Sequence, residues 1–116
     1  MRFAFDIDGT ICNNTNGKYD EANPYKHMID LVNDLYDAGH YIVFSTARGM
    51  GTCDGEPAKA ITKWYRFTQN QLDKWGVKYH ELHLGKIQAD VYVDDKAFRV
   101  QDDGGSVEDL RKFLGD

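Results

Sequence analysis

The sequence has little of several features that would assign it to a special class of protein. Two cysteines, Cys12 and Cys53, are too few for the disulfide framework of a small secreted domain. No apolar run approaches the roughly 20 residues that a membrane-spanning helix needs, and a strand pattern begins already at Phe3, which leaves no signal peptide. Acidic residues outnumber basic ones by 19 to 14, so no broad basic surface invites nucleic acid or an anionic membrane. We therefore expect a cytoplasmic protein with neither partner.

Low-complexity tracts, internal repeats and long linkers are also missing, so residues 1–116 are expected to form a single domain. Strand and helix patterns alternate along it. Strand patterns occur at residues 3–5, 41–44, 77–84 and 91–93, and helix patterns begin at Pro24, Pro57 and Ser106. This alternation predicts an α/β fold: a Rossmann-like, three-layer domain with a central parallel sheet and helices on both faces. Ligands of such sheets bind beyond the carboxyl ends of the strands.

Three polar segments interrupt this pattern. Residues 10–24 form a short polar flap, which is expected at the surface. Residues 49–56 form a glycine-rich loop, expected at the mouth of a pocket. Near the end of the chain, Gly104 and Gly105 resemble a hinge, and Ser106 to Asp109 resembles a capping box for a short last helix.

Two pairs of acidic residues follow apolar strand patterns. Asp6 and Asp8 end the first strand two positions apart, and side chains at i and i+2 of a strand point the same way. Like charges held that close repel unless a cation or a proton lies between them. Asp94 and Asp95 follow the apolar run at 91–93. Because both pairs lie at strand ends, we expect one cation site at the carboxyl edge of the sheet.

The order Asp6, Asp8, Thr46, Lys86, Asp94 suits the hydrolysis of a phosphate monoester. That reaction depends on neutralising the phosphoryl oxygens and on holding the reacting atoms in line. Asp6 would attack phosphorus, and Asp8 would first protonate the leaving alcohol and then deprotonate water. Lys86 and the Thr46 hydroxyl would stabilise the phosphoryl group.

Four residues are candidates for contact with the substrate. Backbone amides of the turn that includes Gly9 and Thr10 would donate to phosphate oxygens. Ala47 and Arg48 directly follow Thr46 and so should lie beside the same group. For Arg48 two interpretations remain open: a clamp on the substrate at the pocket mouth, or an anchor for the loop that follows.

The ordered set of motifs resembles the haloacid dehalogenase-like phosphatase superfamily. Asp-Ile-Asp-Gly-Thr at 6–10, Phe-Ser-Thr-Ala-Arg at 44–48, Gly-Lys at 85–86 and Tyr-Val-Asp-Asp at 92–95 together cover nearly the whole chain. The resemblance implies Mg²⁺ as cofactor and an aspartyl-phosphate intermediate on Asp6. It also implies metal ligation by Asp6, the main-chain carbonyl of Asp8 and Asp94, with Asp95 beside the metal.

The chain has little room for the cap domain that many members of this superfamily carry. It is similar to small capless bacterial phosphatases of capsule and surface-polysaccharide biosynthesis, on the run from Ser45 through the 49–56 loop into the helix pattern that ends at Trp75. The substrate implied is a small phosphorylated metabolite such as a sugar or polyol phosphate. A pocket without a cap is open to solvent or closed by another subunit, so a homo-oligomer is one expectation.

Three other functions fit parts of the pattern. A receiver-type signalling domain also combines acids, threonine and lysine, but there the acid pair comes first, then a single aspartate, then threonine and lysine, whereas here Asp94 and Asp95 follow Lys86. A phospho-ligand binding module without catalysis would retain the same residues. A polynucleotide end phosphatase is disfavoured by the acidic balance of the chain.

Overall fold

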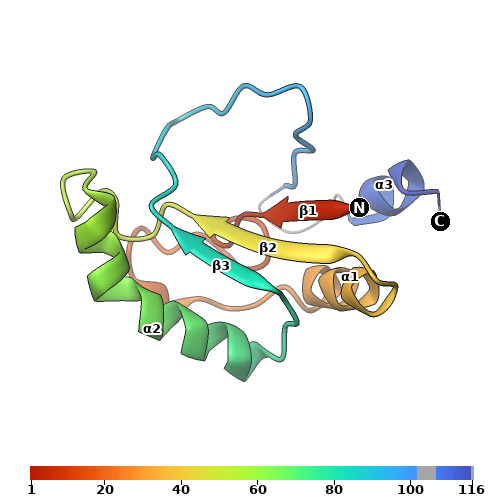
Figure 1. Cartoon of the computed structure of the whole chain (residues 1–116), viewed down its shortest axis with the longest axis horizontal. Coiled ribbons are helices and arrows are strands. Elements are labelled where there is room, and N and C mark those ends of the chain that lie inside the picture. Colours follow the sequence, from red (N-terminus) through yellow and green to blue (C-terminus); the bar gives the residue numbers. More distant parts are fainter. Residues whose placement is uncertain (102–106, 116) are drawn as a thin grey trace.

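A computed structural model of the chain describes residues 1–101 and 107–115. Its centre is a parallel sheet of three strands in the order β1-β2-β3, formed by β1 (Arg2–Phe5), β2 (Tyr41–Thr46) and β3 (Glu81–Leu84) (Figure 1). The register aligns Phe5 with Phe44 and Phe44 with Leu82, which puts large apolar side chains of all three strands on one face. The α/β class and the parallel sheet are thereby confirmed.

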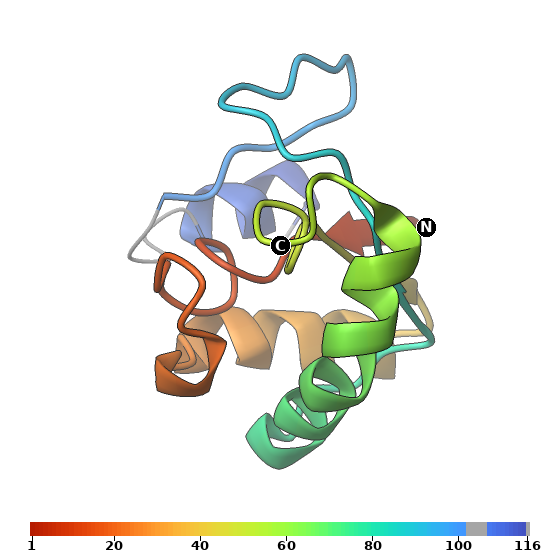
Figure 2. The ribbon, with the colours of Figure 1, turned by 90° about the vertical axis from the view of Figure 1, so that its left-hand side faces the viewer.

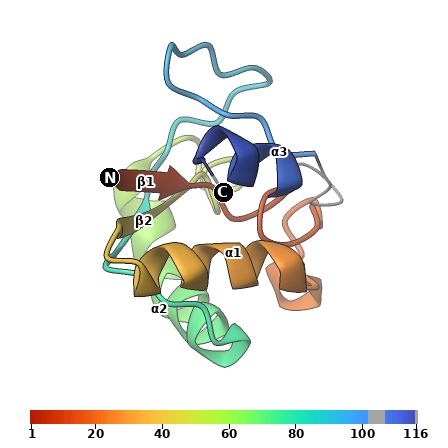
Figure 3. The ribbon, with the colours of Figure 1, turned by 90° about the vertical axis from the view of Figure 1, so that its right-hand side faces the viewer.

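Two long helices cover this apolar face. Helix α1 (Lys26–Asp37) follows β1 and packs against β2, and α2 (Pro57–Trp75) follows β2 and packs against β3. Both lie on the same side of the strands in Figure 3. Leu31 of α1, Leu72 of α2 and Phe44 of β2 belong to one buried core. The predicted start of α2 at Pro57 and its end at Gly76 are confirmed; Gly76 has φ of 74°, a left-handed conformation that glycine adopts without strain.

We expected helices on both faces of the sheet, but among the described residues the two long helices cover one face. When consecutive strands lie side by side in the order β1-β2-β3, right-handed connections put both intervening helices on one face. The last helix, α3 (Val107–Phe113), packs against α1, where Arg111 Nη2 lies 2.8 Å from Asp34 Oδ2. On the opposite face of the sheet Ala4 and His83 are exposed.

The expected fourth strand at 91–93 is wrong. Residues 85–101 form a loop that stands clear of the sheet in Figures 1 and 2. Val91, Tyr92 and Val93 are 74%, 47% and 94% exposed. Three apolar residues form a strand only where a neighbouring strand provides a ladder of hydrogen bonds, and no strand among residues 1–101 and 107–115 pairs with them. The polar residues that follow this run are therefore placed by a loop.

Two element boundaries are shifted for local reasons. Pro24, expected as the first residue of α1, instead pairs with Cys12 in an antiparallel bridge, so the chain is still extended there. Val77, expected to begin β3, donates its N–H to Leu72 O and closes the end of α2.

Helix α3 confirms the predicted last helix, whereas Gly104, Gly105 and Ser106 lie outside the described residues. Within residues 1–101 and 107–115, the helices lack the combination of length and apolar character that crossing a bilayer requires.

Candidate active site

A cavity of about 510 Å³ lies where β1 and β2 end. Asp6 and Asp8 enter it from the segment after β1, and Thr46, Ala47 and Arg48 from the end of β2. This is the carboxyl edge of the sheet, where the sequence predicted a ligand site. The flap and two loops complete the wall with Asn14, Thr15, Asn16, Gly17, Tyr19, Gly51, Thr52, Gln88, Ala89 and Tyr92.

Asp6 is a half-buried carboxylate held by the backbone beside it. The N–H of Ile7 donates to Asp6 Oδ1 over 2.8 Å. Burial raises the pKa of Asp6 above its ordinary value of 3.8, and the positive charge of Lys86 is the strongest influence that opposes this rise. Lys86 therefore acts electrostatically on Asp6, although its side chain does not line the cavity.

Asp8 is held in a different way, by the guanidinium of Arg48. Arg48 Nε donates to Asp8 Oδ2 over 2.9 Å, and Nη2 donates to Asp8 Oδ1 over 3.0 Å. The Arg48 side chain is fully buried, whereas that of Asp8 is 17% exposed toward the cavity. The guanidinium is thus engaged with Asp8, which favours the interpretation of Arg48 as an anchor, while a contact with substrate stays a prediction because Arg48 also lines the cavity.

Three residues that the sequence did not indicate surround Arg48. Its Nη1 donates to Gln71 Oε1 over 2.7 Å and lies 3.4 Å from Thr68 Oγ1. Its guanidinium lies 4.8 Å from the centre of the Tyr19 ring. One feature of the sequence could have indicated two of them: Thr68 and Gln71 are polar residues on the inward side of α2.

Gly9 and Thr10 do not lie in the cavity wall. The N–H of Gly9 donates to Cys12 O over 2.8 Å, and the N–H of Thr10 donates to Ile7 O over 3.0 Å. Both amides thus close the turn that follows Asp8. Their hydrogens are already used in this arrangement, and donation to a phosphate stays a prediction.

Thr46 and Lys86 are joined through the backbone. The N–H of Lys86 donates to Thr46 O over 3.2 Å, which brings the loop after β3 to the end of β2. Thr46 Oγ1 accepts the N–H of Arg48 over 3.1 Å and lines the cavity. Ala47 lines it as well.

The carboxylates do not form a metal centre in this arrangement. Within residues 1–101 and 107–115, no three histidine, cysteine, aspartate or glutamate side chains are placed to hold one ion. Both oxygens of Asp8 bind Arg48. Asp94 and Asp95 are exposed on the 85–101 loop, and Asp94 Oδ1 accepts the N–H of Lys96, a bond that lowers its pKa. The structure therefore brings Asp6 and Asp8 together but leaves the second acid pair outside the cavity wall.

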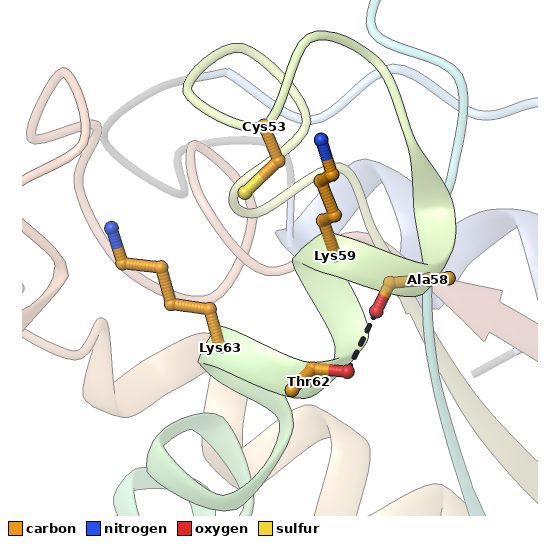
Figure 4. A pocket seen from close by; sticks show the side chains of 5 residues that line it. All are labelled: Cys53, Ala58, Lys59, Thr62 and Lys63. Atoms are coloured by element: carbon orange, nitrogen blue, oxygen red, sulfur yellow. Dashed lines mark hydrogen bonds between the residues drawn. The ribbon is translucent and has the colours of Figure 1, made fainter.

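A second cavity, of about 390 Å³, lies at the start of α2. Figure 4 shows its wall: Cys53, Ala58, Lys59, Thr62 and Lys63. The Thr62 hydroxyl donates to Ala58 O over 2.9 Å, as in an ordinary helical turn. None of the residues that the sequence indicated for chemistry lines this cavity, so the candidate site is the cavity at Asp6 and Asp8.

No protein-family model and no curated protein matches the chain. Among solved structures, the chain is similar to a structural-genomics target from Vibrio cholerae, at 27% identity and a TM-score of 0.83, over 97% of this chain and 95% of that one. It is also similar to D,D-heptose 1,7-bisphosphate phosphatase from B. bronchiseptica, determined with magnesium and phosphate, at 13% identity and a TM-score of 0.50. That match covers 97% of this chain but 63% of the phosphatase. These likenesses support the fold.

Proposed function

We propose that the chain is a phosphomonoester hydrolase of the haloacid dehalogenase type, without a cap domain. One observation carries the proposal: two carboxylates of one cavity, Asp6 and Asp8, lie in different environments. Asp6 is half-buried near the charge of Lys86, whereas Asp8 is bound side-on by Arg48. Two neighbouring carboxyl groups with different surroundings are a frequent basis for different chemical roles.

In the proposed reaction, an oxygen of Asp6 forms a bond to phosphorus while the bond from phosphorus to the ester oxygen breaks. Asp8 gives a proton to the departing alcohol. In the second half, Asp8 takes a proton from water, the water oxygen bonds to phosphorus, and the Asp6 carboxylate is released with inorganic phosphate. Lys86 and the Thr46 hydroxyl are the groups proposed to stabilise negative charge on the phosphoryl oxygens.

A requirement for Mg²⁺ is part of the proposal. The structural neighbour from B. bronchiseptica was determined with magnesium and phosphate, which supports it. Asp94 is the proposed additional ligand, with Asp95 beside it. Because Asp94 is exposed on the 85–101 loop, its participation requires that this loop come nearer to Asp6 than in the structure.

The wall of the cavity supports a sugar or polyol phosphate as substrate. Beyond Asp6, Asp8 and Arg48, its polar side chains are neutral amides and hydroxyls: Asn14, Thr15, Asn16, Tyr19, Thr46, Thr52, Gln88 and Tyr92. Thr15 Oγ1 is buried and lacks a hydrogen-bond partner within the part of the chain that the structure describes. Neutral donors and acceptors match the hydroxyl groups of such a substrate. We propose capsule or surface-polysaccharide metabolism as its setting.

The test is phosphate release from a panel of sugar, polyol, nucleotide and 5′-phosphorylated oligonucleotide substrates, with Mg²⁺ and with a chelator. Release that needs Mg²⁺ and favours sugar or polyol phosphates supports the proposal. Preference for the oligonucleotide, with activity that falls steeply with salt, would assign a polynucleotide end phosphatase instead. Absence of release from every substrate by the folded protein would overturn the proposal of an enzyme. Asp6→Asn serves as the inactive control.

A further inference from the structure

Arg48 is a fully buried cation, and its partners identify what it does. A buried charge is tolerated only when it is paired and hydrogen-bonded. The two bonds from Arg48 to Asp8 run from Nε and Nη2 to the two carboxylate oxygens. This side-on pairing fixes the plane of the carboxylate as well as its position, which a single hydrogen bond cannot do.

The far side of the guanidinium is fixed by groups that are themselves held. Gln71 Oε1 accepts from Arg48 Nη1 over 2.7 Å, while Gln71 Nε2 donates to Tyr19 O over 2.7 Å. Tyr19 in turn stacks on the guanidinium, and its hydroxyl accepts the N–H of Gly49 over 2.9 Å. Helix α2, the flap and the loop after β2 therefore all meet at this one side chain.

We propose that Arg48 is a positioning residue for the proton transfer by Asp8, and that Gln71 supports Arg48 in this role. Arg48 binds the Asp8 carboxylate from behind and leaves its exposed side toward the cavity. This inference rests on the proposed function, because it assigns Asp8 the transfer of a proton to the leaving group. In this role Arg48 acts through Asp8 and takes no part in the making or breaking of the bond to phosphorus.

The proposal predicts a dependence on the leaving group. A leaving alcohol of low acidity needs the proton from Asp8 as the ester bond breaks, whereas a more acidic alcohol leaves with little help. Phenyl phosphate and 4-nitrophenyl phosphate are nearly alike in shape but differ in the acidity of the phenol released. Loss of Arg48 should therefore lower kcat/KM for phenyl phosphate by roughly tenfold more than for 4-nitrophenyl phosphate. A purely structural role would lower both values equally.

The experiment measures kcat/KM for both esters, in Mg²⁺, for the wild type, Arg48→Met, Asp8→Asn and the double variant. In the double variant neither charge is left unpaired, which keeps the test valid if Arg48→Met alone fails to fold. If Arg48 acts through Asp8, Arg48→Met lowers kcat/KM little or not at all in the Asp8→Asn background. Multiplicative losses of the two changes would overturn the proposal.

Two further variants sharpen the result. Arg48→Lys keeps the charge but cannot bind both carboxylate oxygens side-on. It should therefore show the same altered preference between the two esters as Arg48→Met. Gln71→Leu should shift the preference in the same direction but less. A wild type that releases phosphate neither from these esters nor from the sugar and polyol phosphates refutes the proposed function and the inference with it. If the wild type is active and Arg48→Met has the same ratio of kcat/KM between the two esters, the inference alone is refuted.

Discussion

The ammonium group of Lys86 lies 4.2 Å from the centre of the Tyr92 ring, at the edge of the cavity that contains Asp6. A cation over an aromatic face is attracted by the electron density of the ring. The same charge lowers the pKa of Asp6, against the larger effect of burial, which raises it. Lys86 thus links the 85–101 loop to the ionisation of the proposed nucleophile.

Replacement of Lys86 by methionine should shift the acidic limb of the pH profile of kcat/KM to higher pH, besides lowering the rate. Without the nearby positive charge the pKa of Asp6 rises further, so more alkaline solution is needed to ionise it. Lys86→Arg keeps the charge and should retain the position of the limb. An acidic limb at the same pH in Lys86→Met would show that Lys86 does not control the ionisation of Asp6.

Asp6→Asn should lower kcat by roughly 10³-fold or more. The same change should nevertheless raise the free energy of unfolding at neutral pH. Because burial raises the pKa of Asp6 above 3.8, the folded protein binds this proton more tightly than the unfolded chain. The free energy of unfolding then decreases as the pH rises from 3.8 through the folded-state pKa, and the loss persists above it. Urea unfolding at several pH values measures the effect, and Asp73→Asn, the same charge change at an exposed site, is the control.

Gly49→Ala should destabilise the protein more than Gly55→Ala. Both glycines have positive φ, 79° and 70°, so alanine costs each about 1 kcal/mol of backbone strain. A Cβ at Gly49 would also lie 2.4 Å from Cδ1 of Trp64, whereas one at Gly55 would meet nothing within 4 Å. Overpacking of this kind adds about 1 to 3 kcal/mol. Equal free energies of unfolding for the two variants would contradict the contact with Trp64.

Cys12 should resist thiol reagents in the folded protein. Burial, and to a smaller extent the charge of Asp8, raise the pKa of its thiol to about 12. At pH 8 on the order of one thiol in ten thousand would then be ionised, against about one in ten at the ordinary value of 9.0. In Cys53→Ser, which leaves Cys12 as the single thiol, a disulfide reagent should react only after the addition of denaturant. Rapid reaction of the native variant would contradict this.

Asp94→Asn should raise the Mg²⁺ concentration that gives half-maximal activity, by roughly tenfold or more, if Asp94 is the proposed ligand. Asp90→Asn is a matched control, because Asp90 is another exposed carboxylate of the same loop. A titration in which both variants match the wild type would remove Asp94 from the proposed metal site. Isothermal titration with Mg²⁺ gives the same comparison without turnover.

Local sequence signals predicted the parts of the fold that depend on neighbours in the chain. Pro57 and Gly76 mark α2 because proline fits a helix start and glycine adopts the left-handed cap. Asp6 and Asp8 were predictable as one cluster, since they follow a strand and lie two positions apart. Their proposed roles come from the chemistry that the motif order suits and from the resemblance, and they stay predictions.

What sequence reasoning missed depends on contacts between distant segments. The burial of Arg48 requires Thr68 and Gln71, which are 20 and 23 positions further along the chain. Nothing in the triplet Thr46-Ala47-Arg48 indicates these partners. The strand predicted at 91–93 was wrong for the same reason. Strand formation depends on a partner strand, which a short apolar run cannot specify.

The neutral wall of the cavity and its acid pair belong to different pieces of the chain. Asp6 and Asp8 are attached to the end of β1, whereas Asn14 to Gly17, Gly51 and Thr52, and Gln88 and Ala89 come from three separate loops. The residues that contact the substrate can therefore change while Asp6 and Asp8 stay the same. If the proposed function holds, exchange of those loops is a starting point for a library that seeks new substrate preferences while the proposed catalytic residues stay unchanged.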